Sequence, residues 1–552
     1  MIRPVSLAAS ILPLEYQIEA YALRRLLVEK SLSESELIDG LSGTKKQDLS
    51  ARTVFDRLCQ SGLLTRSNAG NLSIRKKARL RVGTVTDGSQ KHRVVNGKDD
   101  ETYFLSDRQA RRVLTGDLVL VDLKQARKRG NPEVRVLAIL STSAKPFLGQ
   151  LGRRGDQNVI IAESGSTNEI SLVPDHLLKG GQDGQFVWAT RLTHPFFTNK
   201  ALAEVMRVVP ETNPAGLLAE RVIEKQGYEV EWPFDLDQLN VSIRRRVDEA
   251  PACHGIDLRD LSFITIDGES ARDFDDAVLC QFDGERYHLD VAIADVSHWV
   301  KPGTVLDQAA RERGNSVYLP DRALPMLPEI LSNDVCSLRP DRERFAFVCR
   351  MIFDQQGNLK NSQFVSGTIC SVARLTYQEA SEHLMGVRPL SPRISDKARH
   401  NLESLHVLAQ KLTERRLNAG GVEFNFPETQ TTYRDDGWLS DIKHIDRPVA
   451  TLIIEECMLA ANVCAAQCLE KNLPAAIYRI HGAPDSDRIC ELRQVLSLFG
   501  VNMNGSSDPS ARDLSECLAK IRQESFPFEA LQTLILRCMK QASYSSNCAP
   551  HF

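Results

Sequence analysis

The stretch "FITIDGESARDFDDAVLC", residues 263–280, decides how the rest of this chain is interpreted. Apolar, strand-like segments flank a short acidic loop on both sides. Carboxylates this close repel one another, and burying such a group raises its pKa and costs stability. A folded protein retains the cluster where a cation neutralises it. The five carboxylates within ten residues are Asp267, Glu269, Asp273, Asp275 and Asp276.

Backbone alternation within "DFDD" divides its side chains between two directions. In an extended segment Asp273 and Asp275 point one way, and Phe274 and Asp276 the other. At a strand end, with Asp267 arriving from "FITI", the four aspartates converge, and a hard divalent cation with oxygen ligands neutralises them. Magnesium keeps several waters and binds substrate phosphate, which suits phosphodiester hydrolysis.

The acidic stretch also has other interpretations. An EF-hand loop is excluded because Gly268 stands at the wrong position for it. A solvated acidic loop is the common fate of a charge run, but the apolar flanks argue against it. A structural calcium site stays open as the alternative. The residues themselves therefore predict a metal-dependent hydrolase.

The composition is that of a multidomain globular protein. The chain has 552 residues, 42% of them hydrophobic and 26% charged, and is too long for one core. No run of about 18 uncharged apolar residues occurs, so we expect no membrane partner. Pro13 and Glu15 interrupt the first apolar run, which argues against a signal peptide and predicts a cytoplasmic protein. The 13 cysteines form no C-x-x-C pair, so we expect buried thiols rather than a zinc site.

The charge is unevenly distributed along the chain. Residues 1–140 carry 25 Lys and Arg against 16 Asp and Glu, a balance of +9, whereas the remainder carries −12. A basic front and an acidic rear suggest a polyanion-binding module joined to a part that uses carboxylates. Chance surface composition is the alternative.

The first 210 residues show three successive patterns. Three helical segments and a short hairpin over 16–76 predict a winged-helix unit, with a plain helical cap as the alternative. Two runs of about five short strands, over 80–140 and 146–210, predict two OB-like barrels. The basic loop "KQARKRGNPEVR" belongs to the first. Aromatic residues are absent from "GSQKHRVV" and "GDQNVIIA", so we expect the barrels to guide RNA by charge rather than by stacking.

Mixed α/β patterning follows the barrels, with long helices expected near 398–418, 447–471 and 526–541. The segment "ATLIIEECMLAANVCAAQCLEKN" is apolar on nearly all sides and predicts a buried central helix. The expected fold class is multidomain α+β. Its expected parts are a winged-helix-like domain (1–79), two cold-shock or OB barrels (80–142 and 143–212), a connector (213–260) and a mixed α/β catalytic domain (261–552).

Several motifs resemble one family. "TIDGESARDFDDAV", "GNSVYLP", "ARLTYQEA", "GGVEFNF" and "YRIHGAPD" strongly resemble the RNB family of hydrolytic 3′-to-5′ exoribonucleases. The N-terminal helical unit and the paired barrels resemble the ribonuclease R branch of that family. The resemblance implies a processive, magnesium-dependent enzyme that degrades single-stranded and structured RNA to 5′-mononucleotides.

The resemblance also implies roles for individual residues. It makes four aspartates the magnesium-binding and catalytic groups, with Asp275 the most sensitive of them. Two aromatic residues would hold the 3′-terminal bases between them, and two further residues would line the RNA path. Without the family, core packing is the simpler interpretation of each aromatic. The aspartates are Asp267, Asp273, Asp275 and Asp276, the two stacking residues Tyr318 and Phe424, and the two path residues Tyr377 and Glu456.

The chain ends at "KQASYSSNCAPHF". The resemblance implies that such a sequence continues into a segment with a phosphate-contacting arginine and a C-terminal RNA-binding barrel. We therefore expect a fragment or a truncated product, and the alternative function is a weak or inactive RNA-binding remnant. The expected partners are RNA with single-stranded 3′ ends or overhangs and, beyond RNA, ribosomes or RNA-decay factors. A monomer is expected.

Overall fold

The chain forms two compact units in the computed structural model. The first comprises residues 1–229 with the short segment 433–439, and the second the rest of the chain. The structure describes residues 11–41, 45–75, 80–87, 93–96, 101–123, 133–142, 145–163, 170–210, 214–250, 253–424, 426, 428–445, 447–505, 509–523 and 528–549.

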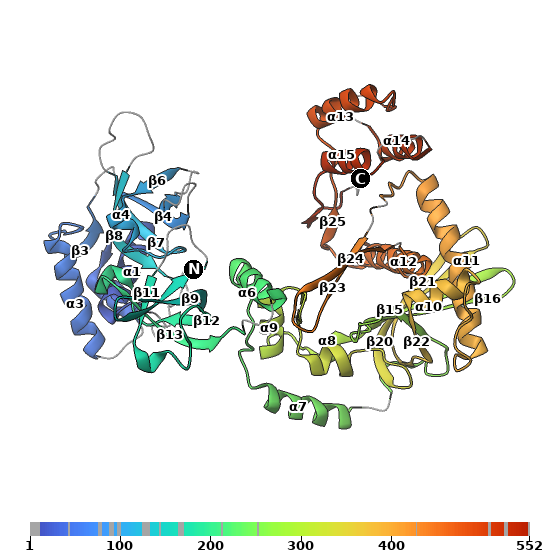
Figure 1. The fold of residues 1–552 in the computed structure, drawn as a ribbon, viewed down its shortest axis with the longest axis horizontal. Coiled ribbons are helices and arrows are strands. Elements are labelled where there is room, and N and C mark those ends of the chain that lie inside the picture. Colours follow the sequence, from blue (N-terminus) through green and yellow to red (C-terminus); the bar gives the residue numbers. More distant parts are fainter. Residues whose placement is uncertain are drawn as a thin grey trace. The chain divides into compact units, whose positions relative to one another are not determined.

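A small helical unit opens the first part of the chain (Figure 1). The side chain of Ser33 and that of Glu36 form a capping box at the start of its second helix. The third helix ends at Gln60, two residues before Gly62, which adopts a φ of +73° as the chain returns as a strand. The elements are α1 (Leu14–Glu29), α2 (Glu34–Asp39), α3 (Lys45–Gln60), and the sheet β1 (Leu32–Ser33), β3 (Asn71–Ile74), β2 (Leu64–Arg66).

Two closed barrels follow, each built from five described strands in the same order. In both, the third strand pairs in parallel with the fifth, and the other described pairs are antiparallel. The predicted basic loop falls mostly outside the described residues. The first barrel contains β4 (Leu80–Asp87), β5 (Arg93–Asn96), β6 (Thr102–Leu105), β7 (Leu118–Leu123) and β8 (Glu133–Ser141). The second contains β9 (Phe147–Arg154), β10 (Gln157–Ala162), β11 (Ile170–Val173), β12 (Phe186–Arg191) and β13 (Ala201–Val208).

A mixed sheet is the centre of the second unit. Its described strands run in the order β14-β21-β20-β17-β16-β15-β22, and only the outermost pair at each edge is parallel. The strands are β14 (Ile256–Asp257), β21 (Leu359–Cys370), β20 (Glu343–Asp354), β17 (Arg286–Ala294), β16 (Asp276–Phe282), β15 (Ile264–Asp267) and β22 (Ala373–Thr376). The predicted fold class, multidomain with mixed α/β structure and paired barrels, is confirmed.

Helices cover both faces of this sheet (Figure 1). The apolar run of β16 serves both, because Val278 and Cys280 face one core while Ala277 and Leu279 face the other. The first core lies under α10 (Tyr377–Leu384), α11 (Asp396–Asn418) and α12 (Val449–Asn472), and the second under α7 (Leu236–Asp248), α8 (Val296–Trp299) and α9 (Val305–Arg313).

Helix α12 matches the predicted buried helix only in part. Its N-terminal half, including Ile453 and Cys457, lies in the core, whereas Val463 is 54% exposed and Leu469 44%. By length and composition this helix is apolar enough to cross a membrane, a test that core helices also pass.

The remaining described α-helices and strands are α4 (Asp107–Ala110), α5 (Pro195–Thr198), α6 (Pro214–Gln226), α13 (Ser486–Leu498), α14 (Ala511–Gln523), α15 (Phe528–Cys538), β18 (Val317–Tyr318), β19 (Ala323–Leu324), β23 (Glu428–Tyr433), β24 (Leu439–Ile445), β25 (Tyr478–Ile480) and β26 (Ser543–Ser545).

Glycine is required where β14 joins the sheet. Gly255 has a φ of +73°, and a Cβ on it would lie 2.0 Å from the carbonyl oxygen of Ser366. Gly284, in the turn between β16 and β17, has a φ of +99° but open space around its Cα. Only the first of these glycines therefore combines a left-handed backbone with a close backbone approach.

We predict that Gly255→Ala destabilises the second unit more than Gly284→Ala does. Both substitutions incur about 1–2 kcal/mol of left-handed strain, and Gly255→Ala adds an overpacking cost of roughly 1–3 kcal/mol. Chemical denaturation of the two variants measures the difference in free energy of unfolding. Equal losses would show that the strand tolerates a side chain at this position.

Candidate active site

The four predicted aspartates lie at one end of two neighbouring strands. Asp267 is the last residue of β15 and Asp276 the first residue of β16, and the two strands pair antiparallel through Ile264 and Val278. The loop 268–275 connects them and carries Asp273 and Asp275. Strand pairing thus fixes the two outer carboxylates, and the loop determines where the inner two lie.

Buried contacts hold the loop in place. The ring of Phe274 is packed in the core, with 8% of the residue exposed, and its backbone N–H donates to Ser337 Oγ at 3.1 Å. The same hydroxyl donates to the carbonyl of Arg272 at 2.8 Å. The N–H of Ala294 in β17 donates to the carbonyl of Asp275 at 2.9 Å. The residue between the two loop aspartates is therefore the anchor that presents them outward.

Arg374 is a residue of the site that the sequence did not assign, although it lies within the quoted motif "ARLTYQEA". Its Nη2 donates to the carbonyls of Gly268 and Glu269, both at 2.8 Å. Its charge also acts to lower the pKa of Asp267. Arg374 therefore fastens the start of the loop and partly compensates the negative charge.

The aspartates act on one another electrostatically. Burial raises the pKa of Asp267 to about 6, with further increases from Asp275 and Asp273 opposed by Arg374. Burial raises the pKa of Asp276 to about 7, and the charges of Asp275 and Asp267 add to it. The pKa of Asp275 is also raised, by desolvation and then by Asp273. The structure therefore brings the four predicted carboxylates into one electrostatic unit.

One carboxylate oxygen in this unit has no partner. Asp267 Oδ2 is buried and accepts no hydrogen bond from any residue that the structure describes. A buried anionic oxygen without a donor is costly, and a proton or a cation relieves that cost. The donor set, all carboxylate oxygen, suits a hard divalent ion.

The cluster is open rather than closed. No three of the four aspartates bring one oxygen each within 4.8 Å of one another, since the only such group among the described residues consists of His254, Asp295 and His298. The arrangement accordingly offers one or two direct carboxylate ligands to an ion. Magnesium commonly binds through that number and leaves the other positions to water and phosphate.

Two predicted tyrosines lie beside the aspartates. Tyr318 is 71% exposed, and its hydroxyl donates to Asp273 Oδ2 at 2.9 Å. Tyr377 begins α10, where burial and the charges of Asp267, Asp276 and Asp275 raise its pKa to about 12.

The other two predicted residues have different surroundings. Phe424 packs against the core of α13–α15, and its ring stacks on Phe426 with centroids 5.9 Å apart. Glu456 in α12 is 3% exposed and accepts hydrogen bonds from Thr413 (3.0 Å) and Arg416 (2.8 and 2.9 Å). It thus joins α12 to α11. Base stacking on Phe424 and a place for Glu456 on the RNA path stay predictions, and the burial of Glu456 does not favour the second.

A cavity of about 890 Å³ adjoins the loop. Ala271, Arg272 and Phe274 of the loop form part of its wall, and four arginines line it against two carboxylates. Spacing along the sequence does not reveal this cavity, since its residues are scattered along the chain. The arginines are Arg244, Arg272, Arg313 and Arg339, and the carboxylates are Glu329 and Asp334.

Known proteins resemble this chain in sequence. The RNB domain family matches residues 256–552, more than half of the chain. Ribonuclease R of Escherichia coli K12 is 35% identical over 460 residues, which is 83% of this chain and 56% of that protein. Ribonuclease R of Vibrio parahaemolyticus is also 35% identical over 460 residues, 83% of this chain and 54% of that protein. The chain therefore spans little more than half the length of these curated relatives.

One solved structure has a similar fold. Mycoplasma genitalium RNase R in complex with ribose methylated single-stranded RNA superimposes with a TM-score of 0.72. The match covers 85% of this chain and 74% of that one, at 22% identity. At this identity the similarity concerns the fold.

We predict that Asp276→Asn stabilises the protein at pH 8 but not at pH 4. Burial raises the pKa of Asp276 to about 7 in the folded chain, whereas the pKa of an unfolded Asp is about 4, so the penalty for burying its charge grows as the pH rises between these values. Removing the charge should raise the free energy of unfolding at pH 8 by roughly 2–4 kcal/mol. Denaturation in chelator-treated buffer measures this.

Asp283→Asn is the control with the opposite sign. A hydrogen bond from His288 lowers the pKa of Asp283 to about 2, so its ionised form is the favoured one. Replacing it should slightly reduce stability at pH 8. If Asp276→Asn behaves like this control, the burial of Asp276 carries no electrostatic penalty.

Proposed function

Because the chain belongs to the RNB family, we propose that it is a hydrolytic 3′-to-5′ exoribonuclease that releases 5′-mononucleotides from RNA. The observation that carries the proposal is the group of four aspartates at the β15–β16 end, with Asp267 Oδ2 buried and unpartnered. Structural carboxylates are usually paired with cations or donors. This cluster instead carries negative charge that its described neighbours compensate only in part, so a bound cation must supply the rest.

We assign the compensating ion as Mg²⁺, held by Asp267, Asp273, Asp275 and Asp276, with one or two of them as direct ligands and the others acting through bound water. Such an ion supplies Lewis-acid chemistry, since it activates water and neutralises charge on phosphate oxygens. The raised pKa values of Asp267 and Asp276 imply that ion binding and proton release are coupled at neutral pH. Ser337 and Arg374 would act as positioning residues for the loop.

The cavity beside the loop suits a polyanion. Arg313 donates to the carbonyls of Val230 and Pro325, and Arg339 lies 3.7 Å from Asp334. Arg244 and Arg272 are exposed, and no ion pair of theirs is recorded within the described chain. We propose that these two guanidinium groups contact phosphates of the strand that approaches the aspartates.

Tyr318 would contact the substrate at the aspartates themselves. Its ring is exposed while its hydroxyl is tied to Asp273, so the ring is presented in a fixed orientation. A base stacks on such a ring without sequence preference. We keep Phe424 as the proposed second stacking residue, with Tyr377 and Glu456 on the RNA path.

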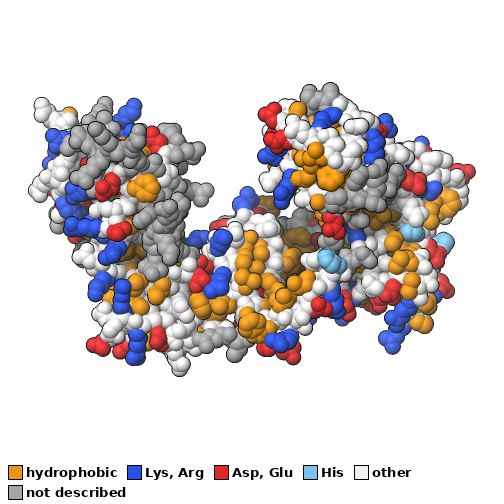
Figure 2. Space-filling model, turned by 45° about the horizontal axis from the view of Figure 1, so that its top comes forward, with side chains coloured by type: hydrophobic (Ala, Val, Ile, Leu, Met, Phe, Trp, Pro, Cys, Tyr) orange, Lys and Arg blue, Asp and Glu red, His pale blue; other side chains and the backbone are white. Residues whose placement is uncertain are grey.

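RNA is the proposed partner, since the Mycoplasma genitalium relative is described in complex with single-stranded RNA. Lys and Arg side chains are spread over the visible described surface of both units, among acidic ones (Figure 2). We propose single-stranded 3′ ends and 3′ overhangs of structured RNA as substrates. We further propose a monomer that acts in the cytoplasm and meets ribosomes or RNA-decay factors there.

The domain division is part of the proposal. We divide the chain into a winged-helix-like domain (1–79), two barrels (80–142 and 143–212), a connector (213–260) and a catalytic domain (261–552). Limited proteolysis tests this division. Cleavage should fall between these ranges, because each range is expected to unfold as one cooperative unit.

We predict that the chain shortens a 5′-labelled single-stranded RNA in the presence of Mg²⁺ and that Asp275→Asn does not. The products should form a ladder that collapses to a short 5′ fragment, since removal starts at the 3′ end. Loss of one catalytic carboxylate should reduce the rate by at least 100-fold. If the unchanged chain binds the RNA as Asp275→Asn does but does not shorten it, the proposal is contradicted. That result would favour an RNA-binding protein without nuclease activity.

We also predict that Arg244→Gln weakens RNA binding more than Arg245→Gln does. The two residues are neighbours on α7, but only Arg244 lines the cavity, whereas Arg245 lies 3.8 Å from Glu249 at the surface. Each lost phosphate contact should flatten the dependence of log affinity on log salt by about 0.7. Fluorescence anisotropy at several salt concentrations tests this, and equal slopes for the two variants would remove the cavity from the RNA path.

A further inference from the structure

A second group of possible metal ligands lies outside the aspartate cluster. Each of three residues contributes one ligand atom, and these three atoms lie within 4.8 Å of one another. The residues are His254, Asp295 and His298. His254 precedes β14 at the sheet edge, whereas Asp295 and His298 belong to the start and the body of α8. Segments about 40 residues apart in the chain thus meet at one point.

The carboxylate of this group is oriented by its neighbours. Asp295 is the N-cap of α8, and its Oδ1 accepts from Ser297 Oγ at 2.6 Å and from the N–H of His298 at 3.2 Å. Its Oδ2 lies 3.8 Å from His254 Nε2. The side chain of Asp295 is 11% exposed, so one oxygen serves the helix and the other is directed at the histidine.

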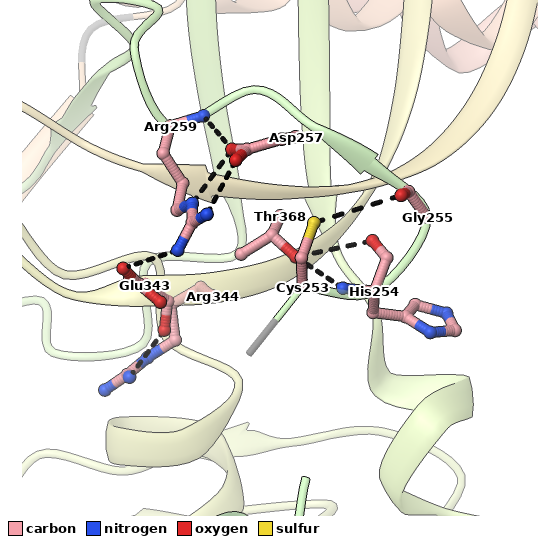
Figure 3. Close-up of polar contacts among 8 residues, drawn as sticks. All are labelled: Cys253, His254, Gly255, Asp257, Arg259, Glu343, Arg344 and Thr368. Carbon is pink, nitrogen blue, oxygen red and sulfur yellow. Dashed lines mark hydrogen bonds and ion pairs between the residues drawn. The ribbon is translucent and has the colours of Figure 1, made fainter. Parts of the chain in front are cut away.

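His254 is fixed through its backbone (Figure 3). Its N–H donates to Thr368 Oγ1 at 2.8 Å, and the same hydroxyl donates to its carbonyl at 3.3 Å. The tight approach of Gly255 to Ser366 fixes the next residue. Figure 3 shows the imidazole pointing away from Thr368, and its Nε2 faces Asp295.

His298 completes the group from α8. Its ring centroid lies 4.9 Å from that of His254 and 4.7 Å from that of Phe345. Within the described chain, no hydrogen bond to a ring nitrogen of His298 is recorded. Two imidazoles without strong partners and an oriented carboxylate oxygen therefore converge on one half-buried point.

We propose that His254, Asp295 and His298 bind one divalent transition-metal ion of the zinc class, with solvent completing the coordination. Imidazole nitrogen favours such ions, whereas the all-oxygen aspartate cluster favours magnesium. A tetrahedral zinc ion with bonds of about 2.0–2.1 Å separates its ligand atoms by about 3.4 Å. The 3.8 Å between His254 Nε2 and Asp295 Oδ2 thus requires only a small side-chain movement.

Two cations near the site have other partners. Lys301 Nζ donates to the carbonyl of Ser297 at 3.0 Å. Arg246 donates to the carbonyls of Trp299 (3.1 Å) and His298 (3.5 Å). Both charges are directed at backbone oxygens of α8 and leave the three ligand atoms accessible, although they reduce the affinity for a cation.

Such an ion would link two parts of the sheet. It would tie the segment before β14 to the start of α8, directly after β17. Ala294, the residue before Asp295, donates its N–H to the carbonyl of Asp275. The ion would therefore stabilise the support of the aspartate loop without belonging to it.

The test uses the full chain after treatment with a chelator. Zn²⁺ is titrated into it in the presence of excess Mg²⁺, which is added to occupy the aspartate cluster. Isothermal titration calorimetry should show one Zn²⁺ per chain. His254→Gln and His298→Gln should each weaken binding at least tenfold. His288→Gln is the matched control, since this half-exposed histidine on β17 is paired with Asp283 at 2.9 Å. Asp275→Asn should bind Zn²⁺ as the unchanged chain does.

X-ray absorption of the zinc-loaded unchanged chain gives a second readout that needs no variant. Scattering from two imidazoles would support the site, and an all-oxygen shell would overturn it. Absence of Zn²⁺ binding, binding by both histidine variants as tight as that of the unchanged chain, or loss of binding in Asp275→Asn would also overturn it. None of these measurements depends on nuclease activity. They therefore test the zinc site even if the chain proves not to be a nuclease.

Discussion

Electrostatic repulsion among Asp267, Asp273, Asp275 and Asp276 is the constraint on which the second unit depends. Neutral loops of this length vary freely, but a loop that gathers four carboxylates must be held against its own charge. The two strands on either side are buried on both faces and paired on both sides, which makes their ends rigid. The stability of the sheet thereby offsets the free-energy cost of the repulsion among the aspartates, whereas contacts within the loop do not.

The contacts that hold the loop are few, and each has a separate task. Phe274 places its ring in the core and so turns the flanking aspartates outward. Ser337 binds the loop from the far side through one hydroxyl. Arg374 fastens the beginning of the loop and offsets part of the charge at Asp267. Tertiary contacts therefore set the pKa values on which ion binding depends.

The second unit offers two coordination chemistries on one sheet. Carboxylate oxygens gather at the β15–β16 end, and imidazole nitrogens with one carboxylate gather beside α8. Hard and borderline ions discriminate between such donor sets. The backbone hydrogen bond from Ala294 to Asp275 connects the supports of the two groups, so an ion at one would influence the stability of the other.

The sequence determined the strands and helices, the paired barrels and the identity of the acidic loop, because hydrophobic period and charge spacing are local properties. The family resemblance of its motifs also led to Tyr318 and Tyr377, whose place beside that loop only the structure shows. The sequence did not find Arg374, the cavity arginines or the group of His254, Asp295 and His298. The exposed half of α12 was misjudged for the same reason, since burial depends on which distant elements pack together. Only the tertiary structure decided these points, because strand pairing brings residues from separate segments to one place and the spacing along the chain does not record it.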